Sequence, residues 1–238
     1  MSAAAALADE TSIVRAQLSG QAAQRSRTKI LHVIGGFGFG GTERLCLDIA
    51  GHAAAHGGNV LVAGLDPSRS GMEQAFAGLP GARVLRGPGR QHRAVLRWMR
   101  AVISRERPGA VFVYAFGLTH VVVALAARLA GNVPVFVSAG NPPPPESGRW
   151  KWRLVVAASR LLGVPIHSCS SAVETALLGL GVGLPKGSRV IPNGCDVAGI
   201  AARAVAARRA RRPGGPLVIG MVGRLDAIKD HATLIRAF

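Results

Sequence analysis

The chain has 238 residues, 49% of them hydrophobic, and a mean hydropathy of +0.29, so a packed core is expected and general disorder is excluded. The formal net charge of +17 predicts a surface that attracts polyanions or anionic lipid headgroups. No apolar run is long enough to span a membrane, and Met1–Thr28 lacks the basic start and apolar centre of a secretory signal. The three scattered cysteines argue against a disulfide framework and favour a reducing cytoplasm.

After an N-terminal extension over residues 1–28, expected to be frayed or weakly helical, predicted strands and helices alternate. Short apolar runs predict strands at Lys29–Ile34, Asn59–Leu65, Ala82–Leu85, Ala110–Tyr114, Val133–Ser138, Pro165–Cys169 and Arg189–Ile191. Helical spacing predicts helices at Thr42–Ala55, Gly71–Ala77, Gln91–Arg105, His120–Ala130, Arg149–Leu162 and Ser171–Leu180, with Thr42 as the N-cap of the first. The expected fold class is α/β: a Rossmann-like parallel sheet with helices on both faces and a ligand site at the carboxyl ends of the strands.

The expected domain organisation follows from changes in composition. Residues 29–196 form the Rossmann-like domain, and residues 197–216, rich in Ala, Arg and Gly, form a crossover linker. Residues 217–238 contain the first strand and helix start of a second such domain, which we expect to be truncated at Phe238.

Five glycines lie between Gly35 and Gly41, where the first strand passes into a helix. The spacing Gly36-x-Gly38-x-x-Gly41 fits the dinucleotide-binding pattern, which also needs an acidic residue at the end of the second strand. Asp66 lies there, so an NAD(P)-binding oxidoreductase remains an alternative. A further alternative is that these glycines only provide tight turns.

A second glycine turn follows the apolar run Leu217–Val222. Gly223 begins a loop that carries Arg224 and Lys229 and leads into a helical segment. A glycine allows close backbone approach, and two cations beside a helix N-terminus supply positive charge, so this corner suits a diphosphate. The alternative is two surface cations at the start of a helix.

Three segments in this order resemble glycosyltransferase family 4, whose members are retaining transferases with two Rossmann domains, the GT-B type. The segments are Gly40-Gly-Thr-Glu-Arg44, Val190-Ile-Pro-Asn-Gly-Cys-Asp196, and Gly223-Arg-Leu-Asp-Ala-Ile-Lys229 followed by His231–Phe238. The resemblance implies transfer of a sugar from a nucleotide-diphosphate sugar to a hydroxyl acceptor, with the donor held between the two domains.

The resemblance also implies roles for individual residues. Arg224 and Lys229 are the expected catalytic residues, and they bind the donor phosphates together with Gly40, Gly41 and Thr42. Asn193, Gly194 and Asp196 belong to the hinge. No metal ion and no cofactor are expected, since the cations would stabilise the leaving group and no His, Cys and Asp cluster has ligand spacing. A glutamate pair found further along in the family is absent up to Phe238, so the fragment is expected to be inactive alone.

The acceptor side departs from the family pattern. Many members have histidines at two positions that correspond here to Tyr114 or Phe116 and to Gly140. His120 and Asn141 lie nearby and are candidate acceptor-site residues. For His120 the alternative is a helix N-terminal residue without a catalytic role.

Four arginines, Arg90, Arg93, Arg97 and Arg100, recur at intervals of three and four residues, so they are expected on one face of an amphipathic helix. This pattern favours peripheral contact of a cytoplasmic enzyme with the inner, anionic membrane surface, where a lipid-linked acceptor would be met. A polysaccharide acceptor and a merely solvated basic face are alternatives.

The hypothesis of a non-enzymatic polyanion-binding domain rests on charge alone. Nucleic acid is not an expected partner, because no duplex-reading motif or aromatic-studded basic face is found.

Overall fold

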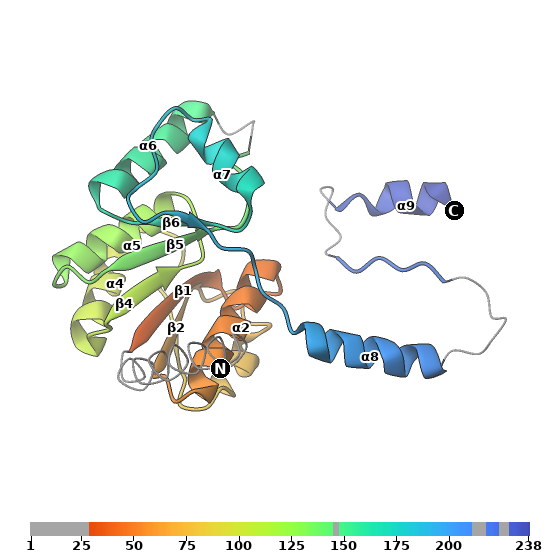
Figure 1. Cartoon of the computed structure of the whole chain (residues 1–238). Coiled ribbons are helices and arrows are strands. Elements are labelled where there is room, and N and C mark those ends of the chain that lie inside the picture. Colours follow the sequence, from red (N-terminus) through yellow and green to blue (C-terminus); the bar gives the residue numbers. More distant parts are fainter. Residues whose placement is uncertain (1–28, 145–147, 211–217, 224–228) are drawn as a thin grey trace, which may run out of the picture. The chain divides into compact units, whose positions relative to one another are not determined.

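The computed structural model describes residues 29–144, 148–210, 218–223 and 229–238. The chain divides into two compact units, Met1–Gly194 and Cys195–Phe238. The extension expected over residues 1–28 lies outside the described residues. Figure 1 shows the elements of both units, most of them with the labels used below.

The first unit is built on a parallel sheet of seven strands in the order β3-β2-β1-β4-β5-β6-β7. The strands are β1 (Ile30–Gly36), β2 (Val60–Asp66), β3 (Arg83–Arg86), β4 (Ala110–Val113), β5 (Val135–Ala139), β6 (Ile166–Ser168) and β7 (Arg189–Val190). The predicted Rossmann-like α/β fold is therefore confirmed. The central strands are apolar on both faces because helices cover both, as parallel sheets require.

The helices that connect these strands are α2 (Gly41–Ala55), α3 (Glu73–Ala77), α4 (His92–Glu106), α5 (Leu118–Leu129), α6 (Arg149–Leu161) and α7 (Ser171–Leu178). The second unit contains α8 (Val197–Ala210) and α9 (His231–Ala237). No helix within the described ranges is both long and apolar enough to cross a membrane.

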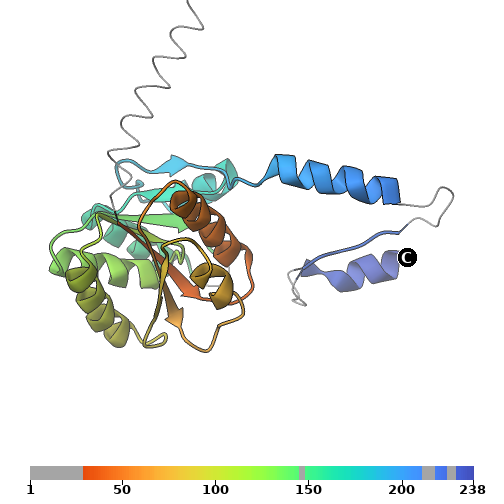
Figure 2. The same cartoon turned by 90° about the horizontal axis from the view of Figure 1, so that it is seen from below.

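Alternate residues of β1 divide the core into two layers. Leu31 and Val33 belong to the layer that also contains buried residues of α4, α5, α6 and α7, whereas Ile34 belongs to the layer that contains those of α2 and α3. Figures 1 and 2 show α2 and α4 on opposite faces of the sheet. The chain therefore leaves β1 toward one face and reaches the neighbouring strand β4 from the other. The carboxyl ends of β1 and β4 lie at this switch point, where doubly wound sheets form their binding crevice.

Two expectations about local structure are wrong. Helix α2 begins at Gly41 with Gly40 as its N-cap, so Thr42 is already inside the helix. Residues 197–210 of the expected linker form helix α8, because alanine and arginine favour helices and Asp196 Oδ1 accepts the N–H of Gly199 at 2.9 Å. The role of this segment as a linker between domains stays a prediction.

The second wrong expectation is the strand after the linker. Residues 218–223 do not form a strand, and Val222 is fully exposed. The described part of the second unit contains no neighbouring strand that could satisfy its backbone groups, so the apolar run alone does not produce β-structure.

Candidate functional site

The glycine loop between β1 and α2 (residues 35–41) is held firmly against the segment that follows β2. The N–H of Phe37 donates to the carbonyl of Arg69 at 2.7 Å, and the N–H of Met72 donates to the carbonyl of Phe37 at 2.7 Å. The ring of Phe37 is buried and packs edge-on against Phe76, with 5.4 Å between ring centroids. Backbone hydrogen bonds and an aromatic anchor therefore set the position of this loop.

The side chain of Arg69, which sequence reasoning missed, crosses this glycine loop. A Cβ on Gly38 would lie 2.7 Å from Nε and Nη2 of Arg69, and one on Gly36 would lie 2.9 Å from its Cβ. Arg69 Nη2 lies 3.0 Å from Glu43 Oε1, and their side chains are 39% and 8% exposed. The glycines leave the space that the guanidinium fills, and a nearly buried carboxylate holds it there. The only sequence signal was an arginine shortly after β2, and its meaning depends on the pairing of β1 with β2.

The amino end of α2 lies open beside this guanidinium. Gly41 and Thr42 are exposed, and the N-cap Gly40 offers no side chain to the first-turn amides. A Cβ on Gly41 would meet no atom within 4 Å. Free amides at a helix N-terminus carry partial positive charge, and with Arg69 they favour an anion, although the Glu43 carboxylate that pairs with Arg69 also lies against Gly40 and offsets part of this charge. The consecutive residues Gly40, Gly41 and Thr42 lie at this helix start, and their contact with donor phosphates stays a prediction.

Asp66, on which the oxidoreductase alternative depends, is already used locally. Its carboxylate accepts hydrogen bonds from the hydroxyl and the N–H of Ser68, at 2.6 and 3.1 Å. These two hydrogen bonds, with weaker contributions from Arg90 and Arg69, lower the pKa of Asp66. Both of its closest donors belong to its own turn, so the local geometry is that of a turn-stabilising aspartate.

His120 is fully buried, and its imidazole connects three parts of the domain. Its Nδ1 accepts the N–H of Gly117 at 3.0 Å, and its Nε2 lies 2.7 Å from Ser159 Oγ. The ring stacks on Phe116, which in turn stacks on Trp152. Burial lowers the pKa of His120 to about 4. The prediction that His120 contacts the acceptor is therefore corrected: the side chain has no exposed surface and secures the start of α5.

Asn141, the other acceptor candidate, is exposed in the loop that follows β5 at the carboxyl edge of the sheet. The preceding residue is fixed from β6, because Cys169 Sγ donates to the carbonyl of Gly140 at 3.3 Å and Cys169 N–H donates to Ala139 at 3.1 Å. Asn141 therefore stands on an anchored loop with its side chain free to meet a ligand, and its acceptor role stays a prediction.

Tyr114, one position at which the family often has histidine, is buried as well. Its hydroxyl lies 3.0 Å from Nδ1 of His32, and their rings stack with 5.9 Å between centroids. Burial lowers the pKa of His32 to about 4 and raises the pKa of Tyr114 and of the neighbouring Cys46. This polar group belongs to the core beneath α2, so at neutral pH it is uncharged and not available to substrate.

The second unit contains the other expected phosphate-binding corner. Lys229 is exposed, and a Cβ on Gly223 would lie 3.6 Å from its Cγ and 3.7 Å from the ring of His231. Helix α9 follows at once, with Asp230 Oδ1 accepting the N–H of Thr233 at 3.3 Å. Lys229 therefore lies beside both a glycine and a helix start. Arg224 lies outside the described residues.

The expected hinge residues are exposed. Asn193 and Gly194 end the first unit, and Asp196 caps α8 in the second. The division between the two units falls after Gly194, within the predicted hinge. The capping carboxylate gives Asp196 a structural role that the sequence had assigned only by resemblance.

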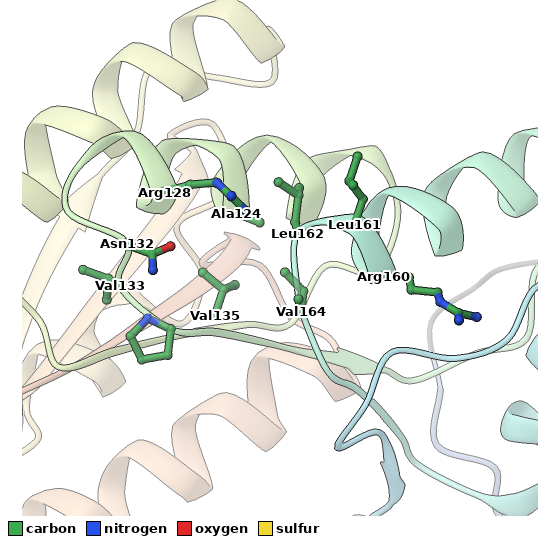
Figure 3. Close-up of a pocket in the computed structure, with 11 residues that line it drawn as sticks. Ala124, Arg128, Asn132, Val133, Val135, Arg160, Leu161, Leu162 and Val164 are labelled. Atoms are coloured by element: carbon green, nitrogen blue, oxygen red, sulfur yellow. The ribbon is translucent and has the colours of Figure 1, made fainter.

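A pocket of about 410 Å³ lies away from these residues, between the carboxyl ends of α5 and α6 (Figure 3). Its lining includes Arg128, Asn132, Val135, Arg160 and Leu161. Because Val135 begins β5, the pocket lies at the amino edge of the sheet, opposite the glycine loop. Among the described residues, no group of three or more His, Cys, Asp or Glu side chains is placed to hold a metal ion.

Residues 39–198 match the model of Glycosyltransferase Family 4. No protein with a curated description matches the chain.

Solved structures with a similar fold have low sequence identity. Anabaena HepE in complex with UDP-glucose superimposes with a TM-score of 0.63 at 21% identity over 88% of this chain and 57% of that one. HepE with UDP and glucose gives a TM-score of 0.64 at 20% identity over the same shares. A glycosyltransferase from Rickettsia africae gives 0.55 at 12% identity, over 80% of this chain and 51% of that one. The chain thus spans little more than half the length of these proteins, and the likeness shows the fold.

Proposed function

The chain belongs to glycosyltransferase family 4, and we propose that it forms the acceptor-side domain and the start of the donor-side domain of an enzyme that uses a nucleotide-diphosphate sugar. The family match supports glycosyl transfer. HepE was crystallised with UDP and with UDP-glucose, which supports a uridine diphosphate sugar as the donor class. In the proposed reaction the sugar leaves the diphosphate oxygen and bonds to an acceptor hydroxyl with retention of configuration, and that hydroxyl gives up its proton.

The observation that carries this proposal is the placement of Arg69. Its guanidinium lies along the glycine loop, fixed by Glu43, beside the open first turn of α2. We assign the diphosphate contacts of the first unit to Arg69 and to the amides of Gly41 and Thr42. A charge-assisted hydrogen bond from a positioned arginine is stronger than one between neutral groups, and a helix N-terminus adds to it.

In the second unit, Lys229 and Arg224 are proposed to stabilise the departing nucleoside diphosphate. Negative charge on the leaving oxygen grows as the bond to the sugar breaks, so a fixed cation lowers the energy of the transition state more than that of the bound substrate. Lys229 has the exposed position beside Gly223 that this role requires. No cofactor and no metal ion enter this scheme.

The acceptor is proposed to be a hydroxyl compound that meets the carboxyl edge of the first unit near Asn141. Lipid-linked and polysaccharide acceptors both fit the basic surface, and a cytoplasmic enzyme at the inner face of a membrane fits the net charge of +17. The exposed row on α4 consists of Arg93, Arg97 and Arg100, whereas Arg90 precedes the helix. This row supplies charge for such contact.

Titration calorimetry tests the donor class. We expect the purified chain to bind UDP or UDP-glucose and to bind NADH no better than buffer controls. Binding of NADH without UDP would instead support the oxidoreductase alternative. If UDP binding is present but unchanged in Arg69→Ala, the donor class stands and the assignment of Arg69 is wrong.

A further inference from the structure

Helix α6 exposes an apolar stripe to solvent. Trp150 is 62% exposed, Leu154 is 60% exposed and Leu161 is 83% exposed, and the exposed Ala157 lies between the last two. Their spacing of four, three and four residues places them on one side of the helix. The opposite side is the one that packs on the domain, through Val156, Ser159 and the half-buried Trp152. A domain-surface helix normally has one apolar side, so the outer stripe is additional to the side that packs on the described part of the first unit.

Cations surround this stripe. Arg149, Lys151, Arg153 and Arg160 are all exposed on α6, and the helix contains no acidic residue. Lys151 lies 5.7 Å from the ring centroid of Trp150. Long basic side chains beside exposed leucines and a tryptophan are typical of helices that lie in the headgroup region of a bilayer.

Helix α4 shows the difference that the outer stripe makes. It carries an exposed row of Arg93, Arg97 and Arg100, but its large apolar residues Val95 and Met99 face the core. None of the exposed large apolar side chains in the described part of the chain lies on α4. Helix α4 can therefore attract an anionic surface but has nothing to insert into it, whereas α6 has both properties.

We propose that α6 is the element that inserts into an anionic bilayer surface, with Trp150, Leu154 and Leu161 among the lipid headgroups. Charge complementarity selects lipid of negative charge, since helix α6 itself, Arg149–Leu161, offers cations and apolar groups and no anion. The helix starts shortly after the loop of Asn141, so insertion of its first turn with Trp150 would bring that loop close to the membrane. This inference goes beyond glycosyl transfer and does not depend on it.

Vesicle sedimentation tests the proposal with the complete chain. The probes are phosphatidylcholine vesicles with and without phosphatidylglycerol, each at about 0.1 M and about 0.5 M salt. The Debye length is roughly 10 Å at the lower salt concentration and much shorter at the higher one, so only the lower concentration leaves electrostatic attraction largely unscreened. We expect pelleting only with phosphatidylglycerol, and part of it should persist at the higher salt concentration because apolar insertion is not screened. Trp150 fluorescence should become protected from iodide in the pelleted fraction.

The decisive variant combines Trp150→Ser, Leu154→Ser and Leu161→Ser, three exposed positions at which folding should be retained, as circular dichroism would show. Its partition into anionic vesicles should fall about tenfold or more, since each apolar side chain contributes to binding. The matched control combines Arg93→Gln, Arg97→Gln and Arg100→Gln on α4. This variant should bind anionic vesicles more weakly at low salt but keep the part of the binding that persists at high salt.

Four outcomes would overturn the proposal. The first is wild-type pelleting by the α6 variant at both salt concentrations. The second is no difference between vesicles with and without phosphatidylglycerol. The third is loss of all binding in the α4 control alone, which would mark a purely electrostatic surface. If the α6 variant also loses retention on a polyanion resin such as heparin in proportion, the stripe acts through charge and not through insertion. Loss of UDP binding in any variant would concern the donor site and not this surface.

Discussion

The Nε2 atom of His120 lies 2.7 Å from Oγ of Ser159 and joins helix α5 to helix α6 within the core. The direction of this hydrogen bond is settled by its neighbours. The N–H of Gly117 donates to Nδ1, and Ser159 Oγ donates to the carbonyl of Val155 at 2.8 Å, so Nε2 carries the proton and donates to Oγ. The ring is thus held neutral in one tautomer, because a second ring proton would lose the bond from Gly117.

The first prediction is that the domain loses stability between neutral and mildly acidic pH. His120 and His32 are buried with their pKa values lowered to about 4, whereas an unfolded histidine titrates near 6.5. Below pH 6.5 the two histidines bind protons in the unfolded chain but stay neutral in the folded chain. Their contribution to the free energy of unfolding is therefore complete above pH 6.5 and decreases as the pH drops toward 4. Each histidine accounts for roughly 3 kcal/mol across that window, by order of magnitude. Urea unfolding at a series of pH values measures this loss.

A matched pair of variants separates the buried histidines from the rest. His120→Gln should flatten the pH dependence by about half, although it lowers stability at neutral pH. His52→Gln, at an exposed position on α2, should leave the dependence unchanged. An equal pH dependence in wild type and His120→Gln would contradict the neutral, buried imidazole.

The second prediction concerns the guanidinium over the glycine loop. Arg69→Ala should weaken UDP binding by about tenfold to a hundredfold, the range for one charge-assisted hydrogen bond. Arg97→Ala, on the opposite face of the sheet, is the control of equal charge and should bind UDP as the wild type does. Titration calorimetry at constant ionic strength gives both affinities. A similar loss of UDP affinity in the two variants would mean that the net charge of the protein, and not the position of Arg69, explains the effect.

The third prediction distinguishes glycines that serve folding from glycines that serve binding. Gly64→Ala would place a methyl group against the ring of Phe37, and we expect it to destabilise the fold by about 1–3 kcal/mol. Gly41→Ala meets no protein atom within 4 Å, so its stability should be unchanged or slightly higher. The same methyl group stands where a phosphate would approach the helix amides, and UDP affinity should fall. Thermal unfolding and calorimetry on both variants check the two effects, and unchanged UDP affinity in Gly41→Ala would place the phosphate elsewhere.

The fourth prediction concerns the leaving group. In the complete enzyme, Lys229→Ala and Arg224→Ala should each lower kcat by about a hundredfold to a thousandfold, with a smaller effect on substrate binding. Steady-state kinetics with the donor varied separates the two parameters. Lys186→Ala, an exposed lysine of the first unit, serves as the control. Wild-type kcat in both variants would make Lys229 and Arg224 ordinary surface cations.

Much of the first unit was predictable because its strands are short, apolar and separated by helices of clear periodicity, which is the pattern of a parallel sheet buried on both faces. The glycine loop was also recognisable, since its spacing is local. His120 was misjudged because proximity in sequence to the acceptor region does not reveal burial. Its partner Ser159 lies 39 residues away, on another helix.

The sequence by itself determined the alternation of strands and helices, the family resemblance and the basic charge, because each depends on residue types at short spacing. Only the tertiary structure decided which charges matter. The pairing of β1 with β2 brings Arg69 to Glu43 and across the glycines, and no spacing rule contains that contact. Likewise, the sequence predicted α4 as a basic amphipathic helix and α6 only as a helix. Packing against the sheet buries the apolar residues of α4 and leaves Trp150, Leu154 and Leu161 of α6 in solvent, since a helix can turn only one side toward the core.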